Sequence, residues 1–253
     1  MIDDTLKGKS GRIFFYSVEG AMENQWYWKN KDFFEAFDAQ KEKFLRVSQK
    51  MEIDKNTMIF FEEDLGDCCF YLSKGLVRIF SVSDSGKEPI FFLRRQGDLF
   101  GLSEVLGNVP RKANAQALTS CELYKIHSAE LEKLLKEDYL LARRIISLLG
   151  ARVRYLGDYV SNLMTCTVKI RLVKVFIALI YDSIPSAEDW NNPVTIPIKI
   201  SQEQLASMTG STQPTISDLL QELQKDGIIT IARKQVCVCK PYMLLNIIES
   251  CEI

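Results

Sequence analysis

Residues 201–223 carry the side chains with the most specific chemical purpose in the sequence. Ser201 followed by Gln204 is typical of a capped helix start, and Gly210 of a helix end. Pro214 is tolerated in the first turn of a second helix. The segment therefore predicts two short helices joined by a tight turn, with the second helix presenting a polar face to a DNA major groove. We expect DNA contacts from Ser211, Thr212, Gln213, Thr215, Ser217 and Asp218.

A basic turn follows this pair of helices. Two β-rich runs, 228–231 and 235–239, flank it. We expect a β-hairpin, or wing, with Arg233 and Lys234 at its tip contacting DNA phosphates, which position a protein without reading sequence. For residues 201–223 taken alone, an ordinary pair of packed helices is the alternative, and the adjoining wing favours DNA binding.

The sequence contains no comparable pattern of catalytic residues. With a single histidine, His127, the chain offers no Ser-His-Asp or His-rich metal constellation. It also lacks a glycine-rich phosphate loop followed by Lys-Ser or Lys-Thr. We therefore expect no enzyme, no catalytic residue and no metal site.

Length and composition bound the architecture and the compartment. The chain has 253 residues, enough for two domains, and 32 Lys and Arg against 33 Asp and Glu. Because there is no overall basic field, DNA contacts must come from a local patch. The seven cysteines lack paired short spacings and no signal peptide precedes them, which indicates a reducing, cytoplasmic compartment. No apolar run approaches the roughly 20 residues needed to cross a bilayer, so we expect no membrane insertion.

From Met58 to Ile126 short β-rich runs alternate with glycines, the spacing of an antiparallel sandwich or roll. From Ser128 the pattern changes to long helical spacing that continues with little interruption to about Asn162. The fold class expected is α+β, with an N-terminal antiparallel β-roll, a long coiled-coil dimerisation helix and a C-terminal winged helix-turn-helix. We place the domains at 1–127, 128–163 and 164–253. The predicted strands cover 58–61, 69–72, 77–80, 90–93 and 122–126.

The long helix carries an apolar stripe from Ala142 to Leu163 at alternating spacings of four and three, which predicts a coiled-coil seam. The alternative is that the stripe packs on its own β-domain. A partner helix explains better why seven consecutive seam positions hold no polar residue, and symmetry then favours a two-fold dimer. We expect dimer contacts from Ile146, Leu149, Val153, Leu156, Val160 and Leu163.

With these parts in this order, residues from about 44 to 240 resemble the CRP/FNR family of bacterial regulators, named for the cyclic-AMP receptor protein and the fumarate and nitrate reduction regulator, and in particular its FNR/CprK-like ligand-sensing members. The resemblance implies a cyclic-nucleotide-binding-like roll and a homodimeric transcription regulator on a palindromic operator in double-stranded DNA. Effector binding at the roll and long helix then reorients the DNA-binding domains. RNA polymerase is a further partner if the protein is an activator. The matching stretches are 66–75, 96–101, 115–118, 168–171, 204–206 and 210–212.

Departures from the family pattern concern the effector. Nucleotide-binding members carry a Glu for the ribose hydroxyl and an Arg-Ser pair for the cyclic phosphate, where this chain has Leu102, Arg111 and Lys112. The polar pair that meets adenine corresponds to Leu156-Gly157, which cannot supply those hydrogen bonds. Cyclic AMP is therefore disfavoured, and we expect an apolar or anionic small molecule held partly by Arg111 or Lys112, unless both are solvated loop charges. The expected effector site is Gly101, Leu102, Ser103, Arg111, Lys112, Leu156 and Tyr159.

Iron–sulfur and haem sensing are also disfavoured. Oxygen-sensing members place their cluster cysteines at the N-terminus, whereas here none precedes Cys68, and Cys68 and Cys69 are expected on opposite faces of a strand. The only histidine, His127, lies at the junction of roll and helix rather than in the expected pocket. Cys237 and Cys239 share a face of the wing strand, where packing is favoured over a thiol redox switch.

Departures in the second helix of the pair concern the operator. Many family members present an Arg-Glu…Arg set there, where this chain has Gln213, Pro214 and Asp218. Gln213 suits adenine and Asp218 can accept from cytosine, so we expect an atypical half-site. The first 44 residues lie outside the resemblance, and Trp26, Tyr27 and Trp28 are expected to cover the roll, with lining of an effector pocket as the alternative.

A second class of function is a sensing module that serves another output, such as a kinase or channel regulatory subunit. A sensor alone needs no helix-turn-helix and wing, so residues 201–240 favour the ligand-gated transcription factor.

Overall fold

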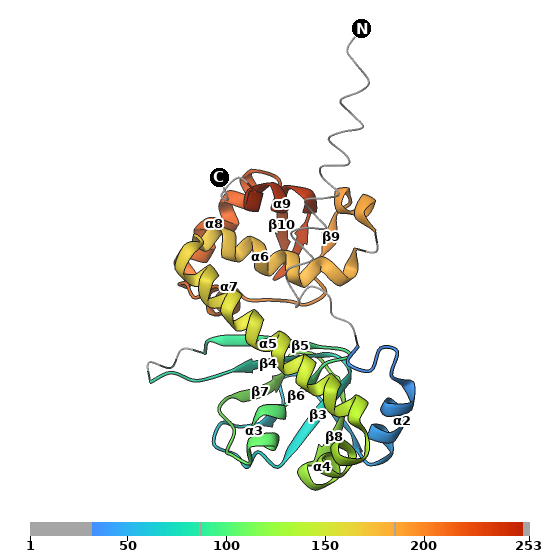
Figure 1. Cartoon of the computed structure of the whole chain (residues 1–253). Helices are drawn as coiled ribbons and strands as arrows, with labels where there is room; N and C mark the ends of the chain where they lie inside the picture. Colours follow the sequence, from blue (N-terminus) through green and yellow to red (C-terminus); the bar gives the residue numbers. More distant parts are fainter. Residues whose placement is uncertain (1–31, 85, 87, 185, 250–253) are drawn as a thin grey trace. The chain divides into compact units, whose positions relative to one another are not determined.

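The computed structural model describes residues 32–84, 86, 88–184 and 186–249 (Figure 1). They divide into two compact units, one within Asn30–Val153 and the other within Arg154–Ile253. Trp26, Tyr27 and Trp28, for which the sequence predicts a covering role, lie outside the described residues.

Two four-stranded antiparallel sheets build the first unit (Figure 1). One has the order β1-β8-β3-β6 and the other β2-β7-β4-β5. The predicted antiparallel roll is confirmed, because each of the five predicted runs overlaps a strand and only Phe61 of them lies outside one. The strands are β1 (Gln49–Ile53), β2 (Met58–Phe60), β3 (Cys68–Lys74), β4 (Leu76–Phe80), β5 (Ile90–Arg95), β6 (Leu99–Phe100), β7 (Asn114–Ala117) and β8 (Cys121–His127).

The side chains of β3 alternate between two hydrophobic clusters. Cys68 and Leu72 pack between the sheets, whereas Cys69 and Tyr71 face the cluster that includes helix residues. The prediction that Cys68 and Cys69 point to opposite faces is thus confirmed.

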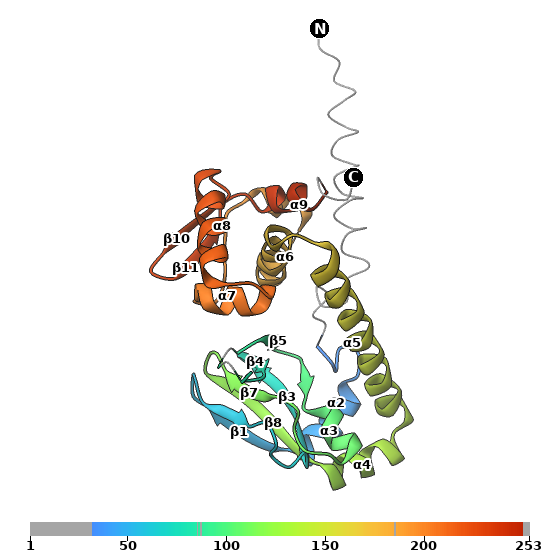
Figure 2. The same cartoon turned by 90° about the vertical axis from the view of Figure 1, so that its left-hand side faces the viewer.

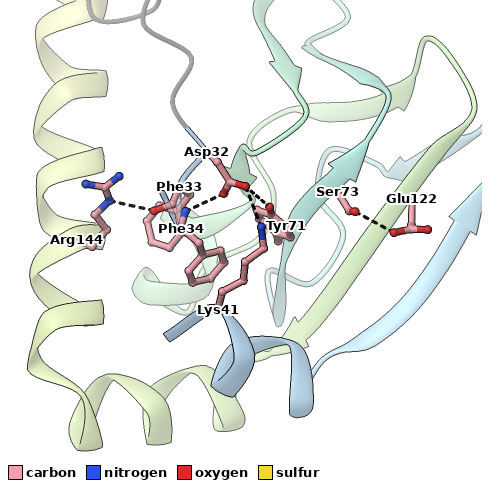
Figure 3. A network of polar contacts seen from close by, with 8 residues as sticks. All are labelled: Asp32, Phe33, Phe34, Lys41, Tyr71, Ser73, Glu122 and Arg144. Carbon is pink, nitrogen blue, oxygen red and sulfur yellow. Dashed lines mark hydrogen bonds and ion pairs between the residues drawn. The ribbon is translucent and has the colours of Figure 1, made fainter. Parts of the chain in front are cut away.

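The segment before helix α2 (Asp38–Arg46) is fastened to the roll by the polar contacts in Figure 3. Asp32 accepts hydrogen bonds from the Tyr71 hydroxyl at 2.8 Å and from Lys41 Nζ at 2.9 Å. On its other side, Arg144 Nε donates to the carbonyl oxygen of Phe33 at 3.0 Å. Gly97 has a φ of 90°, and a Cβ there would lie 2.7 Å from the Cα of Asp32, so only glycine allows this approach.

The predicted long helix is broken into α4 (Ser128–Glu137) and α5 (Tyr139–Thr165), which corrects the near-continuous helix expected from Ser128. Asp138 causes the break, since its Oδ1 accepts from the Leu141 amide at 3.1 Å and its Oδ2 from Lys43 Nζ at 2.8 Å. Neither α5 nor any other helix in the described ranges is long and apolar enough to span a bilayer.

The second unit packs a helix pair and a small sheet around a shared core (Figure 2). The sheet has the order β10-β11-β9 and is antiparallel. The edge strand β9 (Val194–Thr195) is short, because Pro197 has no N–H for a longer ladder. The remaining elements are α6 (Val168–Ile180), α7 (Gln202–Thr209), α8 (Gln213–Lys225), β10 (Ile229–Ala232), β11 (Gln235–Val238), α9 (Pro241–Glu249) and two 3₁₀ turns (Tyr181–Ser183 and Ala187–Asn191); the first unit adds α3 (Leu102–Gly107).

Candidate functional site

The turn between α7 and α8 has the helix-capping and helix-ending residues that the sequence predicts. Ser201 Oγ accepts from the Gln204 amide at 3.1 Å, and Gln204 Oε1 accepts from the Ser201 amide at 2.9 Å, which confirms the capping box. Gly210 ends α7 with a φ of 59°, in the left-handed region that glycine adopts without a Cβ clash. Pro214 lies in the first turn of α8, as predicted. These local signals set the direction in which α8 leaves the turn.

The first turns of α8 have an apolar side and a polar side. Ile216 and Leu220 are buried, whereas Gln213 and Asp218 are exposed and Ser217 is half-buried. The side chains of Gln213 and Asp218 are therefore available to a groove.

Three of the residues expected to contact DNA also build the turn and the start of α8. Thr212 is the N-cap of α8, and its Oγ1 accepts from the Thr215 amide at 3.4 Å and lies 2.9 Å from Thr215 Oγ1. Ser211, half-buried, donates its amide to the carbonyl of Ala206 at 2.9 Å. The predicted set thus divides into residues that build the helix start and residues that project from it.

Gln221 is a candidate contact that the sequence reasoning missed. It is exposed and follows Gln213 and Ser217 at intervals of four, so the three side chains share one face of α8. The helical spacing alone was sufficient to include it. One residue further on, Glu222 pairs with Lys169 of α6 at 2.7 Å, which ties the adjacent face of α8 to the core of the unit.

The wing is a two-residue hairpin. Strands β10 and β11 pair from Ile229 with Val238 to Ala232 with Gln235. The tip residues Arg233 and Lys234 have φ values of 50° and 66°, as a type I′ turn requires, and both side chains are exposed. Neither side chain has an ion pair within the described ranges.

The expected effector residues near α3 lie together in the first unit, and Arg111 occupies their centre. Its guanidinium donates to the carbonyl oxygens of Gly101, at 3.0 Å, and Cys68, and lies 3.3 Å from Glu104 Oε2. It also stacks 4.3 Å from the centre of the Phe60 ring. With 1% of its surface exposed, Arg111 is a buried cation whose terminal nitrogens are already engaged, and not a solvated loop charge.

The other expected effector residues have different surroundings. Lys112 is exposed and pairs with Glu63 at 3.4 Å, so the solvated-charge alternative describes this residue well. Leu102 is buried and Ser103 is exposed. Leu156 and Tyr159 belong to the second compact unit; Tyr159 is half-buried, and burial raises its pKa.

Arg94 and Arg152 form a cationic site that the sequence reasoning missed. Arg152 of α5 donates to the Leu99 carbonyl oxygen, while its buried Nε has no hydrogen-bond partner among the described residues. Burial, and then the charge of Arg94, lower the pKa of Arg152 to about 9, and Asp98 offsets part of this. Arg94 is 6% exposed, with its guanidinium 4.5 Å from the centre of the Phe92 ring. At neutral pH the buried Arg94 and the half-buried Arg152 thus repel each other.

The predicted seam of α5 is an exposed apolar stripe. Val153 has 69% of its surface exposed and Val160 has 52%. The side chains of Ile146, Leu156 and Leu163 are exposed as well. Leu149 is the exception, because it is half-buried against the core of its own unit.

The described cysteines are free thiols, and burial raises the pKa of Cys68 and Cys69. Cys237 and Cys239 are half-buried on one face of the wing, flanking the buried Val238. Among the described residues no three His, Cys, Asp or Glu side chains gather as a metal site.

Two protein-family models match the chain. The cyclic nucleotide-binding domain matches residues 50–138, and the Crp-like helix-turn-helix domain matches residues 170–247. The chain is 31% identical over 194 residues to the global nitrogen regulator of Nostoc sp. strain PCC 7120, covering 76% of this chain and 85% of that protein. It is 25% identical over 185 residues to the cAMP-activated global transcriptional regulator CRP of Salmonella typhimurium, covering 73% and 86%.

Solved structures agree on the fold. FixK2 from Bradyrhizobium japonicum matches with a TM-score of 0.68 at 20% identity, over 79% of this chain and 96% of that one. The c-di-GMP responsive global regulator CLP from Xanthomonas campestris matches with a TM-score of 0.66 at 20% identity, over 80% and 99%.

Proposed function

The chain belongs to the CRP/FNR family of transcription regulators, and from this premise we propose how its own residues read DNA and sense an effector. As a member it is an effector-responsive, DNA-binding transcriptional regulator that acts as a homodimer on a palindromic operator. The proposal concerns which side chains do this and which class of effector they accept. We also place its action in the cytoplasm, with RNA polymerase as a partner if it activates.

The DNA contacts are assigned to the polar face of α8 and to the wing tip. The observation that carries this assignment is the exposure of Gln213 and Asp218 in the first turns of α8, where Ile216 and Leu220 are buried. Gln213 is placed to make the bidentate contact with adenine that glutamine favours, and Asp218 to accept from the amino group of cytosine. Arg233 and Lys234 contribute phosphate contacts, which add affinity without sequence preference.

Dimerisation is assigned to the apolar stripe of α5. A row of exposed valine, leucine and isoleucine side chains at coiled-coil spacing is costly to leave in water, and a second copy of the same helix buries it. The half-buried Leu149 marks the region in which the stripe also packs on its own roll.

Cyclic nucleotides do not fit the roll of this chain. Relatives are named for activation by cyclic AMP or response to cyclic di-GMP. Here the position expected to bind the ribose holds the buried Leu102, and the terminal nitrogens of Arg111 are spent on the carbonyls of Cys68 and Gly101 and on Glu104. Arg111, which the family resemblance assigns to phosphate binding, therefore acts as a core residue in this protein.

An anionic effector is instead assigned to Arg152. Its Nε is buried and, like that of Arg111, lacks a partner among the described residues; what sets Arg152 apart is that its charge lies close enough to that of Arg94 for the two to repel. A carboxylate or phosphate would accept the unused hydrogen bond and neutralise the repulsion. Because Arg152 lies on the helix that carries the seam, occupation of this site is linked to the dimerisation element.

The test is selection of bound sequences from a random duplex pool, with the purified full-length dimer in the presence and absence of cell extract as a source of effector. We expect a two-fold-symmetric motif enriched with extract, and a Gln213→Ala variant that loses preference at one symmetric pair of positions. A motif that is unchanged in this variant contradicts the α8 assignment. No enrichment under either condition contradicts the DNA-reading function and favours the sensor-module alternative.

A further inference from the structure

Three helix ends meet at Arg171, one turn into α6. Its Nη1 donates to the carbonyl oxygen of Cys166, the residue after α5, at 2.7 Å. Its Nε donates to the carbonyl oxygen of Thr209, the last residue of α7, also at 2.7 Å. Helix ends leave their final carbonyls without intrahelical partners, and they carry partial negative charge. One guanidinium therefore satisfies the ends of two helices from a third.

Other contacts strengthen the same junction. Lys174 Nζ, one turn further along α6, donates to Asn162 Oδ1 of α5 at 2.7 Å. A Cβ on Gly210 would lie 3.0 Å from Leu163 Cδ2, so the last turn of α5 lies against the turn that leads into α8. Thr209 is 1% exposed, and its hydroxyl donates back to the Leu205 carbonyl oxygen at 2.8 Å.

We propose that Arg171 is a positioning residue for DNA binding, which joins the last turns of the seam helix α5 to the helix-turn-helix so that they move as one body. The inference rests on the assignment of α8 as the DNA-reading helix. The carbonyl of Thr209 lies four residues before Gln213, so a displacement of the end of α5 is passed to the base-reading residues through a bridge of two hydrogen bonds. This bridge restricts motion at residues 166–167, which connect the seam helix α5 to the unit that contains the DNA-reading helix α8.

Arg171 as a direct phosphate contact is the rival explanation. A phosphate contact contributes close to one unit to the slope of log affinity against log salt concentration, whereas a positioning residue leaves that slope unchanged. The salt slope therefore separates the two roles even if both variants bind the operator weakly.

The experiment compares Arg171→Met and Arg171→Lys with Lys169→Met in the full-length dimer, using the operator found by selection. Lys169→Met removes a cation from the same helix and breaks its partly exposed ion pair with Glu222 of α8, without touching α5 or α7. For Arg171→Met we expect an operator affinity at least tenfold lower, an unchanged salt slope and an unchanged dimer mass. Arg171→Lys keeps the charge but not the fork that reaches both carbonyls, so at least a threefold loss remains. Lys169→Met is expected to stay within about threefold of the parent.

Hydrogen exchange locates the effect. Peptides covering 160–167 and 205–212 are expected to exchange at least threefold faster together in Arg171→Met, and at the parent rate in Lys169→Met. If Arg171→Met does not fold, the same comparison is made with Arg171→Lys. A salt slope lower by about two, one phosphate contact for each protomer of the dimer, assigns Arg171 to a phosphate and overturns the proposal. So does an affinity within twofold of the parent, full recovery in Arg171→Lys, or an equal loss in Lys169→Met. Failure of the selection to yield an operator, with exchange in both peptides still accelerated, contradicts only the assignment of α8.

Discussion

The hydroxyl of Tyr71 donates a hydrogen bond to Asp32 Oδ2 at 2.8 Å, which joins the middle of β3 to the segment before α2. Lys41 completes the group from α2 itself, with its Nζ 2.9 Å from the same oxygen and 5.2 Å from the centre of the Tyr71 ring. A single carboxylate thus holds three segments of the first unit (Figure 3).

Replacing Asp32 makes the stability of the first unit less dependent on pH. Burial by itself raises the pKa of Asp32, but hydrogen bonds from the Phe34 amide, Lys41 and Tyr71 outweigh it and hold the pKa below its ordinary value of 3.8. A depressed pKa contributes stability above the ordinary value, which is lost as the pH falls through the lower, folded value. We expect Asp32→Asn to cost about 1 kcal/mol at pH 7, a difference that disappears toward pH 3.

Urea unfolding of the two proteins between pH 7 and pH 3 measures this difference. Glu42→Gln is the matched control, since among the described residues Glu42 pairs only with Arg46, on the surface of α2, and its replacement is expected to change little. A difference between Asp32→Asn and the parent that stays constant with pH contradicts the role given to the carboxylate.

Two aspartates in the seam are expected to separate the dimer. Val153→Asp with Val160→Asp places charges in the exposed stripe of α5, where pairing with a second copy would bury them without partners. Light scattering should report the monomer mass. Ser147→Asp with Ser161→Asp adds the same charge at exposed positions off the stripe, and should remain a dimer. A dimer mass for the valine variant would refute the seam.

Charge removal at the wing should weaken DNA binding without changing sequence preference. For Arg233→Gln with Lys234→Gln we expect a salt slope lower by about four, because each of the two protomers loses two phosphate contacts, with operator and random DNA affected equally. Gln213→Ala should instead cost about 1–3 kcal/mol per half-site, on the operator alone. Fluorescence anisotropy titrations at several salt concentrations compare the two variants, and the assignments are reversed if the wing variant alters the preferred sequence.

Removing Arg152 should abolish stabilisation by anions without unfolding the protein. For the parent we expect inorganic phosphate or succinate, compared with chloride at equal ionic strength, to raise Tm by about 3 °C or more. Arg152→Met, relieved of its repulsion with Arg94, should start from a similar or higher Tm and show no such rise. Arg154→Met, at an exposed position two residues along, should behave as the parent. Equal shifts in all three proteins would show that the anion effect is general and not sited at Arg152.

Local signals in the sequence predict most of the fold. The five β-rich runs all became strands, and the capping residues Ser201 and Gly210 set the limits of α7. The break between α4 and α5 was not predicted, although Asp138, whose Oδ1 accepts from the Leu141 amide three residues along, is a local signal for it. Strand β7, with its polar and small residues, lacks the apolar pattern of the other strands and is held by its neighbours β2 and β4.

The sites were predicted less evenly, since exposed faces follow from helical spacing and buried charges do not. The face of α8 could be read from spacing alone. Arg94 and Arg152 could not, since they are 58 residues apart in number and only the packing of α5 on the roll brings them close enough to interact. Arg111 was identified by its position, but its engagement with Cys68 and Gly101 requires the folded backbone.

The wing tip places two non-glycine residues, Arg233 and Lys234, in left-handed backbone conformations. Each L-residue held there costs roughly 1 kcal/mol or more relative to glycine, and an Asn-Gly pair would close the same hairpin with less strain. The protein therefore gives up folding stability at this turn to keep two cations at its outermost point. Selection for heat resistance alone would tend to replace these residues, whereas the proposed phosphate contacts of the wing give a reason to retain them.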